Sequence, residues 1–225
     1  MALVNNKSLI QKIVNVFESG SPEGKYDTLV IYADGVNNSH QITFGRSQTT
    51  EQGNLRQLIE MYVENNGKYS TDFVPYLEKI GAESLVDDEN FKRLLKEAAQ
   101  KDKKMCDTQD KFFDKFYWEP ALEWAKRNGF KFSLSMLAIY DSYIHSGHIP
   151  MFLRKRFKEF TPVNGGDEKK WISSYVDVRH QWLKYHERTI LRKTIYRTQT
   201  FINEIERGNW NLEKLPINAN GVIVK

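Results

Sequence analysis

Two carboxylates near the N-terminus combine residue type and position in a way that could do chemistry. Glu18 follows an apolar helical pattern and continues the row of Ile10 and Val14, where a hydrophobic residue is expected. Asp34 precedes Gly35 at the start of a polar turn. A carboxyl group on an apolar face favours its protonated form, whereas one in a hydrated turn stays ionised. Such a pair could supply the acid and the base of glycoside hydrolysis.

The elements that must position these carboxylates are a helix and a hairpin. Apolar spacing over 9–17 predicts a helix that Ser19 and Gly20 end. The runs 28–33 and 40–44 read as two strands, so that Asp34 would lie in the loop of a small hairpin. Taken alone, the two carboxylates also fit a structural interpretation, because most glutamates at helix ends are solvated and most Asp-Gly pairs are plain turns.

Helical patterns dominate the rest of the chain. Asn54, Asp88 and Asp167 each stand where an N-cap residue is expected before an apolar pattern. A longer pattern covers 112–125, with Pro120 placed to kink or divide it. We therefore expect a mainly α (α+β) fold with one small N-terminal β-hairpin sheet.

A third acidic residue, Asp141, lies inside the segment 134–144, which is apolar nearly all round and predicts a buried helix. A buried carboxylate needs a partner. Arg179 and Arg197 each lie on an apolar stripe of a later helix, so we expect a buried Arg–Asp–Arg network that joins three helices. The stripe around Arg197 consists of Ile190, Thr194, Phe201 and Ile205.

Composition narrows the classes of function. The 225 residues, 40% apolar and 13% aromatic, predict one domain spanning 1–225. The net charge of +4 is spread along the chain, so neither nucleic acid nor a membrane is an expected partner. No zinc-ligand spacing or phosphate-binding loop is present, so no metal or cofactor is expected. A basic cluster at 154–156, flanked by Phe152 and Phe157, could touch an anionic ligand but is typical of a solvated helix face.

Together these features resemble the glycoside hydrolase family 46 chitosanases. The resemblance runs from the first helix to about residue 212 and depends on the order and spacing of several short motifs. These are Phe17-Glu18-Ser19, Ala33-Asp34-Gly35 with Ser39, Thr108-Gln109-Asp110, Tyr117-Trp118-Glu119-Pro120-Ala121, Ile139-Tyr140-Asp141, Val176-Asp177-Val178-Arg179 and Arg207-Gly208-Asn209.

The resemblance implies an inverting endo-hydrolase of β-1,4-linked glucosamine polymers, with a two-lobed lysozyme-like fold around a central cleft. Carried over, Glu18 would be the general acid, Asp34 the general base, and Ser39 would orient the attacking water. Inversion requires the two carboxyl groups to stand about 6.5–9.5 Å apart. Asp141, Arg179 and Arg197 would form the buried ion network of the family, with Arg192 as an alternative to Arg197.

The chain departs from the family pattern in the residues expected to bind sugar. Val36 stands where many members have an arginine. Glu51 or Asn54, depending on one gap, stands where an aspartate recognises the substrate amine, and Tyr32 could stack on a sugar ring. The resemblance also implies a monomer that works on chitosan outside the cell, although no secretory signal is visible in the sequence.

Two other functions remain open from the sequence. A muramidase-type enzyme on a similar fold would suit the positive net charge, because peptidoglycan is anionic. A non-catalytic carbohydrate-binding helical protein would make Glu18 and Asp34 incidental. The Glu, Asp and hydroxyl residues at family spacing favour the chitosanase.

Overall fold

The first helix forms where the apolar pattern places it. Helix α2 covers Lys7–Ser19 and buries Ile10, Ile13 and Val14 on one face. Gly20 follows with a φ of 74°, and its backbone N–H donates to the carbonyl of Val16. Because a left-handed residue cannot continue a right-handed helix, Gly20 ends α2 directly after Glu18 and Ser19.

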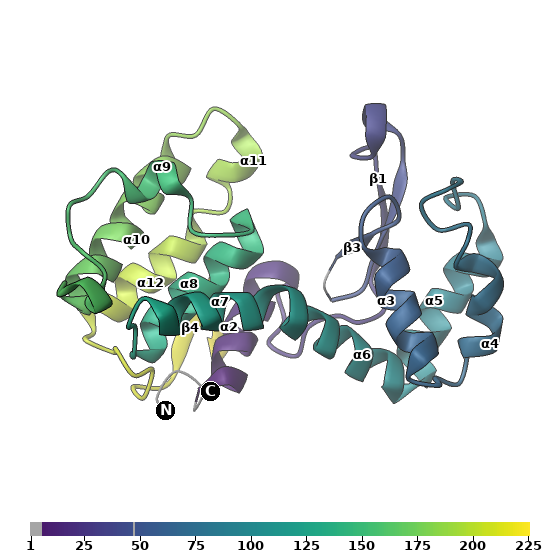
Figure 1. The fold of residues 1–225 in the computed structure, drawn as a ribbon, viewed down its shortest axis with the longest axis horizontal. Helices are drawn as coiled ribbons and strands as arrows, with labels where there is room; N and C mark the ends of the chain where they lie inside the picture. The colour runs from purple at the N-terminus through teal and green to yellow at the C-terminus, as the bar shows by residue number, and fades with distance from the viewer. Residues whose placement is uncertain (1–5, 47) are drawn as a thin grey trace. The chain divides into compact units, whose positions relative to one another are not determined.

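The structure is a computed structural model that describes residues 6–46 and 48–225. These residues form two compact units, which Figure 1 colours along the chain. Unit 1 contains the described residues up to Gly24 together with Phe116–Lys225, and unit 2 is Lys25–Lys115. The expectation of one catalytic domain with a cleft between two lobes stays a prediction.

Unit 2 begins with the predicted hairpin. Strands β1 (Leu29–Tyr32) and β2 (Gln41–Phe44) pair antiparallel, with Leu29 opposite Phe44 and Tyr32 opposite Gln41. A short 3-10 turn, η1 (Val36–Asn38), lies between them. A third strand, β3 (Thr49–Thr50), pairs with β2 and was not predicted, because two residues are too few to show a periodicity.

Helices complete unit 2 and cover a core built by Phe44, Leu58, Tyr62, Phe91 and Phe112, among others. They are α3 (Leu55–Glu64), α4 (Ser70–Phe73), η2 (Val74–Tyr76), α5 (Glu89–Lys101) and α6 (Lys103–Phe113).

Two N-cap predictions in this unit have different outcomes. Asp88 caps α5 as predicted, since its side chain accepts a hydrogen bond from the N–H of Phe91 at 2.8 Å. Asn54 is the N-cap residue of α3 by position, as predicted, but its side chain forms no capping hydrogen bond. Its Oδ1 instead accepts from the N–H of Thr50 at 3.3 Å, which ties the start of α3 back to β3.

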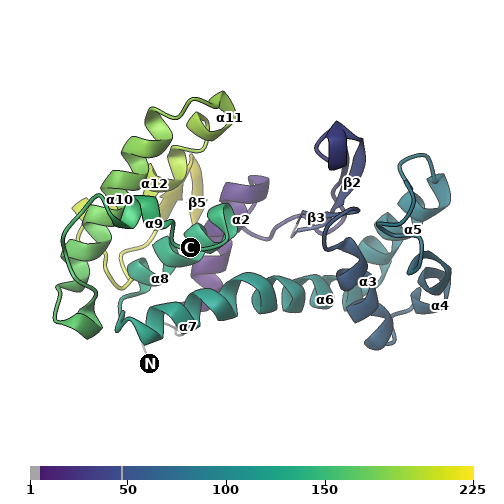
Figure 2. The same ribbon diagram turned by 45° about the horizontal axis from the view of Figure 1, so that its top comes forward.

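Unit 1 is helical apart from a C-terminal hairpin. It contains α2, α7 (Glu119–Arg127), α8 (Ser133–Ser146), α9 (Met151–Arg154), η4 (Pro162–Asn164), α10 (Glu168–Lys184), α11 (Thr189–Arg192), α12 (Tyr196–Glu206), β4 (Ile217–Ala219) and β5 (Val222–Val224). Helix α8 contacts α2, α7, α10 and α12, and Figure 2 shows it among them. Every residue of α8 from 133 to 142 is buried, as its sequence predicts.

The long apolar pattern over 112–125 is divided by a π-helical turn, η3 (Asp114–Trp118). Pro120 is the second residue of α7 and follows this turn directly, as expected of a proline that divides a helical pattern. Asp167 caps α10 as predicted, by accepting from the N–H of Lys170 at 2.8 Å.

The predicted apolar stripe that begins at Ile190 is wrong at that residue. Ile190 lies in the separate four-residue helix α11 and is 60% exposed. The chain turns between α11 and α12, so only Phe201 and Arg197 of the predicted face are buried on α12. No helix within residues 6–46 and 48–225 has the length and apolar character needed to cross a membrane.

Candidate active site

Glu18 lies near the C-terminal end of α2, where its side chain is 19% exposed. Its carboxylate is paired with the guanidinium of Arg197 on α12 rather than enclosed by apolar groups. The neighbouring Phe17 is buried, and its carbonyl accepts a hydrogen bond from the hydroxyl of Tyr196 at 2.8 Å. The end of α2 and the start of α12 therefore hold Glu18 and Arg197 together.

Asp141, Arg179 and Arg197 meet in the interior of unit 1. Asp141 on α8 is fully buried, and Arg197 Nη1 lies 2.7 Å from its Oδ1. Arg179 Nη1, from α10, lies 2.7 Å from its Oδ2. Burial alone would raise the pKa of the Asp141 carboxyl, but the two guanidinium groups outweigh it and hold that pKa below its ordinary value.

The four charges form one continuous chain, Glu18–Arg197–Asp141–Arg179. Arg197 is shared, because one of its nitrogens contacts Glu18 and another contacts Asp141. If Glu18 takes up a proton, Arg197 keeps a buried counterion in Asp141. The network can therefore accommodate both protonation states of Glu18 without leaving a buried arginine unpaired.

His145 lies one turn after Asp141 on α8, and its Nδ1 has no hydrogen-bond partner among the residues that the structure describes. Burial, together with the positive charge of Arg179, lowers the pKa of His145 to about 4. Above that pH the imidazole of His145 is neutral, so it adds no charge beside the ion network.

Asp34 lies in the exposed turn after β1, and two glutamines tie this turn together. Its Oδ1 accepts from Gln41 Nε2 at 2.9 Å, and Gln41 Oε1 accepts from the N–H of Gln52 at 3.1 Å. Gln52 Nε2 donates to Ser39 Oγ at 2.9 Å, while Gln52 Oε1 accepts from the N–H of Val36 at 2.7 Å. Asp34 and Ser39 are thus joined through Gln41 and Gln52, neither of which the sequence singled out.

Gly35 leaves room for that arrangement. A Cβ at Gly35 would lie 2.6 Å from Ser39 Oγ and 2.8 Å from the side-chain amide of Gln52. Any side chain there would displace Ser39 or Gln52. The requirement for Gly35 comes from close approach, because its φ of -75° suits any residue.

The three expected sugar-binding residues differ in solvent exposure. Glu51 is 2% exposed, and its two oxygens accept from the N–H groups of Leu85 at 2.6 Å and Ile42 at 3.1 Å. Asn54 is half-buried, whereas Tyr32 on β1 is 53% exposed. Glu51 is therefore enclosed as a structural acceptor, and its carboxylate is not presented to a ligand in this conformation.

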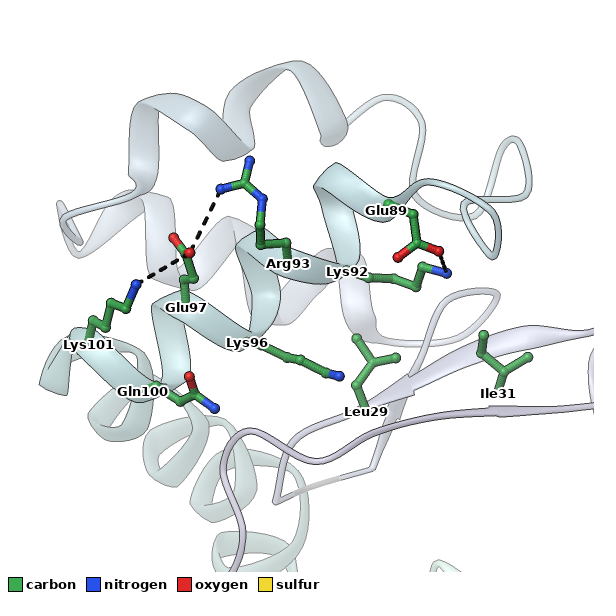
Figure 3. A pocket seen from close by; sticks show the side chains of 9 residues that line it. All are labelled: Leu29, Ile31, Glu89, Lys92, Arg93, Lys96, Glu97, Gln100 and Lys101. Atoms are coloured by element: carbon green, nitrogen blue, oxygen red, sulfur yellow. Dashed lines mark hydrogen bonds and ion pairs between the residues drawn. The ribbon is translucent and has the colours of Figure 1, made fainter.

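A hollow of about 530 Å³ lies between β1 and α5 of unit 2, as Figure 3 shows. It is lined by Leu29, Ile31, Glu89, Lys92, Arg93, Lys96, Glu97, Gln100 and Lys101, so cations outnumber carboxylates in its wall. Lys92 pairs with Glu89, and both Arg93 and Lys101 pair with Glu97. None of the predicted site residues lines this hollow, and its charge is unsuited to a cationic polymer.

One known protein family matches most of the chain. Residues 12–217 match the family described as "Glycosyl hydrolase family 46". The chain belongs to glycosyl hydrolase family 46. Family membership and the expectation of a glycoside hydrolase are thereby confirmed. The helices and small sheet described above confirm the mainly α fold class. The matched range contains Glu18, Asp34 and the whole ion network.

Three similar proteins are each named as a chitosanase. A chitosanase of Bacillus subtilis (strain 168) is 25% identical and aligns over 92% of this chain and 79% of its own length. The native chitosanase of Bacillus subtilis MY002 superposes with a TM-score of 0.79 at 24% identity and 99% coverage of both chains. A family 46 chitosanase of Gynuella sunshinyii, solved with chitotetraose, has a TM-score of 0.79 at 22% identity, with 98% of this chain and 96% of that chain covered.

Proposed function

We propose that this family 46 protein is a chitosanase, an endo-hydrolase that cleaves β-1,4 bonds between glucosamine units and inverts the anomeric configuration. The observation that carries the proposal is the family match over residues 12–217, which includes both candidate catalytic carboxylates. The related enzyme that was solved with chitotetraose supports the substrate class. We also propose that the protein works outside the cell, because a polymer is too large to enter a cell. We further propose that it is a monomer, as the resemblance to family 46 implies.

In this mechanism Glu18 is the general acid that protonates the oxygen of the leaving sugar. Arg197 places the carboxyl group, and Asp141 keeps Arg197 paired while Glu18 carries the proton. A general acid passes between its two charge states during each turnover, and Arg197 has a carboxylate partner in both of them.

Asp34 is the general base that accepts a proton from the attacking water. Its turn is exposed to solvent, which supplies that water. Ser39 orients the water, and Gln41 and Gln52 hold the base and this hydroxyl in one hydrogen-bonded set. In an inverting enzyme, water attacks directly, so no covalent sugar–enzyme bond forms.

Sugar recognition is assigned to the two members of the predicted set that are not fully buried. Tyr32 offers a ring for stacking on a sugar, and Asn54 is the candidate for hydrogen bonding to the substrate amine. We assign Glu51 a structural role in place of the expected amine recognition, because both of its oxygens already accept from backbone N–H groups.

The direct test is a substrate panel with analysis of product configuration. Wild-type protein is incubated with highly deacetylated chitosan, chitin and peptidoglycan, and new reducing ends are measured. We expect release from chitosan, with α-anomers as the first products by proton NMR. Release from peptidoglycan alone would replace the substrate with that of a muramidase, and initial β-anomers would exclude inversion.

A further inference from the structure

A second hollow lies in unit 1, where α9 and α10 pack together, and no residue of the ion network lines it. Its volume is about 400 Å³, within the ~300–1,000 Å³ typical of small-ligand pockets. The wall consists of Arg156, which follows α9, and five residues at the C-terminal end of α10 and just beyond it. These are Gln181, Trp182, Tyr185, His186 and Glu187.

Two aromatic rings give this hollow a flat apolar surface. Trp182 is fixed by edge contacts with Phe152 at 5.4 Å and His186 at 5.0 Å between ring centroids. Tyr185 is 73% exposed, and the ammonium of Lys184 lies 5.5 Å from its ring centroid. A rigid indole beside an open phenol ring can stack on the apolar face of a ligand with little loss of side-chain entropy.

Polar groups stand around these rings. Gln181 offers an amide, Arg156 a guanidinium and Glu187 a carboxylate, and neither charged group forms an ion pair with any residue that the structure describes. The two formal charges cancel, so the wall of this hollow has no net positive charge that would repel a cationic sugar. Donors and acceptors that flank aromatic faces suit a pyranose ring, which has apolar C–H faces and a rim of hydroxyl groups.

We propose that this hollow is a second sugar-binding site, which holds one unit of the polysaccharide substrate apart from the bond being cleaved. The inference rests on the proposed function, because it takes chitosan as the polymer. A second attachment point raises the effective concentration of the polymer at the catalytic residues. An oligosaccharide that is too short to reach both sites gains no affinity from the second site.

The test compares Tyr185→Ala with Phe160→Ala. Tyr185 is mostly exposed, so the variant keeps the fold, and Phe160 is a matched exposed aromatic residue at 65% that does not line the hollow. Both changes are made in a Glu18→Gln background, and binding to insoluble chitosan is measured by co-sedimentation. We expect Tyr185→Ala to weaken binding about three- to tenfold, the loss of one stacked ring, and Phe160→Ala to leave binding unchanged.

The same two changes in the active protein separate the second site from the catalytic site. Hydrolysis of a soluble glucosamine tetramer should be the same in wild type and Tyr185→Ala, while polymer hydrolysis at low substrate falls. Unchanged polymer binding, or an equal loss in Phe160→Ala, overturns the proposal. A parallel loss on the tetramer also overturns it, because the hollow would then belong to the catalytic site. Failure of wild type to cleave either substrate refutes the proposed function instead, and sedimentation still decides the sugar site.

Discussion

Glu18 and Arg197 are 179 positions apart in sequence, yet their side chains form one ion pair. The sequence marks each residue separately, Glu18 as a polar residue on an apolar row and Arg197 as a cation on an apolar stripe. No local pattern can show that they meet, because their contact depends on how α2 and α12 pack against α8. Only the structure shows that Glu18 and Asp141 share Arg197.

Removing Asp141 should destabilise the protein. Asp141→Ala strands two buried arginines, and Arg179 Nε and Nη2 have no other hydrogen-bond acceptor among the described residues. We expect the free energy of unfolding to fall by about 3–5 kcal/mol, measured by urea denaturation. Asp177→Ala, an exposed change on α10, is the matched control. An unchanged urea midpoint in Asp141→Ala would show that the network contributes nothing.

His145 should make stability depend on pH between about 6.5 and 4. Its pKa falls from 6.5 to about 4 on folding, so in this window the unfolded chain binds a proton that the folded chain does not. Stability is complete above the unfolded value and is lost as the pH falls, by up to on the order of 3 kcal/mol. Asp141 adds nothing in this window, because its lowered pKa removes stability only at more acidic pH.

The check compares urea unfolding at pH 7 and pH 4.5 for wild type, His145→Gln and the exposed-site control His148→Gln. The loss of stability on acidification should be clearly smaller in His145→Gln than in the other two. Equal losses in all three proteins would mean that His145 is hydrated and titrates normally in the folded state.

At the scale of elements, the β1–β2 turn depends on side chains that the sequence pattern does not mark. Gln52→Ala removes the donor to Ser39 and the acceptor for the Val36 N–H. We expect kcat/KM on chitosan to fall about 10- to 100-fold, as misplaced catalytic groups do, with an unchanged circular dichroism spectrum. Gln57→Ala on the exposed side of α3 is the control. Full activity in Gln52→Ala would remove Gln52 from the positioning of this turn.

Glu51→Gln distinguishes a structural from a substrate-binding role. One carboxylate oxygen becomes an NH₂ group that faces a backbone N–H, either of Ile42 or of Leu85. One buried donor then lacks an acceptor, so the free energy of unfolding should fall by about 1–3 kcal/mol. Glu64→Gln on the exposed end of α3 should leave it unchanged. A raised KM with unaltered stability would instead restore Glu51 as an amine-recognition residue.

The elements that sequence predicts well are those with strong local signals. Asp88 and Asp167 cap the helices they precede, and Gly20 ends α2. Sequence reasoning misses β3, which is too short to be periodic, and the break that separates α11 from α12. It also interprets Glu51 as a candidate for amine recognition, because the sequence pattern cannot show that this carboxylate accepts from the N–H of Leu85, 34 residues away.

At the scale of the whole molecule, the order of short motifs along the chain predicts the family and the mainly α fold, and the match over residues 12–217 confirms both. The motifs do not predict which polar side chains connect to one another. Glu18 and its ion network belong to unit 1, whereas Asp34, Ser39 and their two glutamines belong to unit 2. Each unit supplies one of the two proposed catalytic carboxylates with its own supporting contacts.

Reducing-end release from chitosan by Glu18→Gln tests most directly whether Glu18 is the general acid. Glu206→Gln, an exposed change on α12, is the matched control. We predict that Glu18→Gln retains the wild-type melting temperature within a few degrees, because Arg197 stays paired with Asp141, and loses at least about 100-fold in kcat. Glu206→Gln should keep full activity. Near-normal turnover by a folded Glu18→Gln protein would contradict the account.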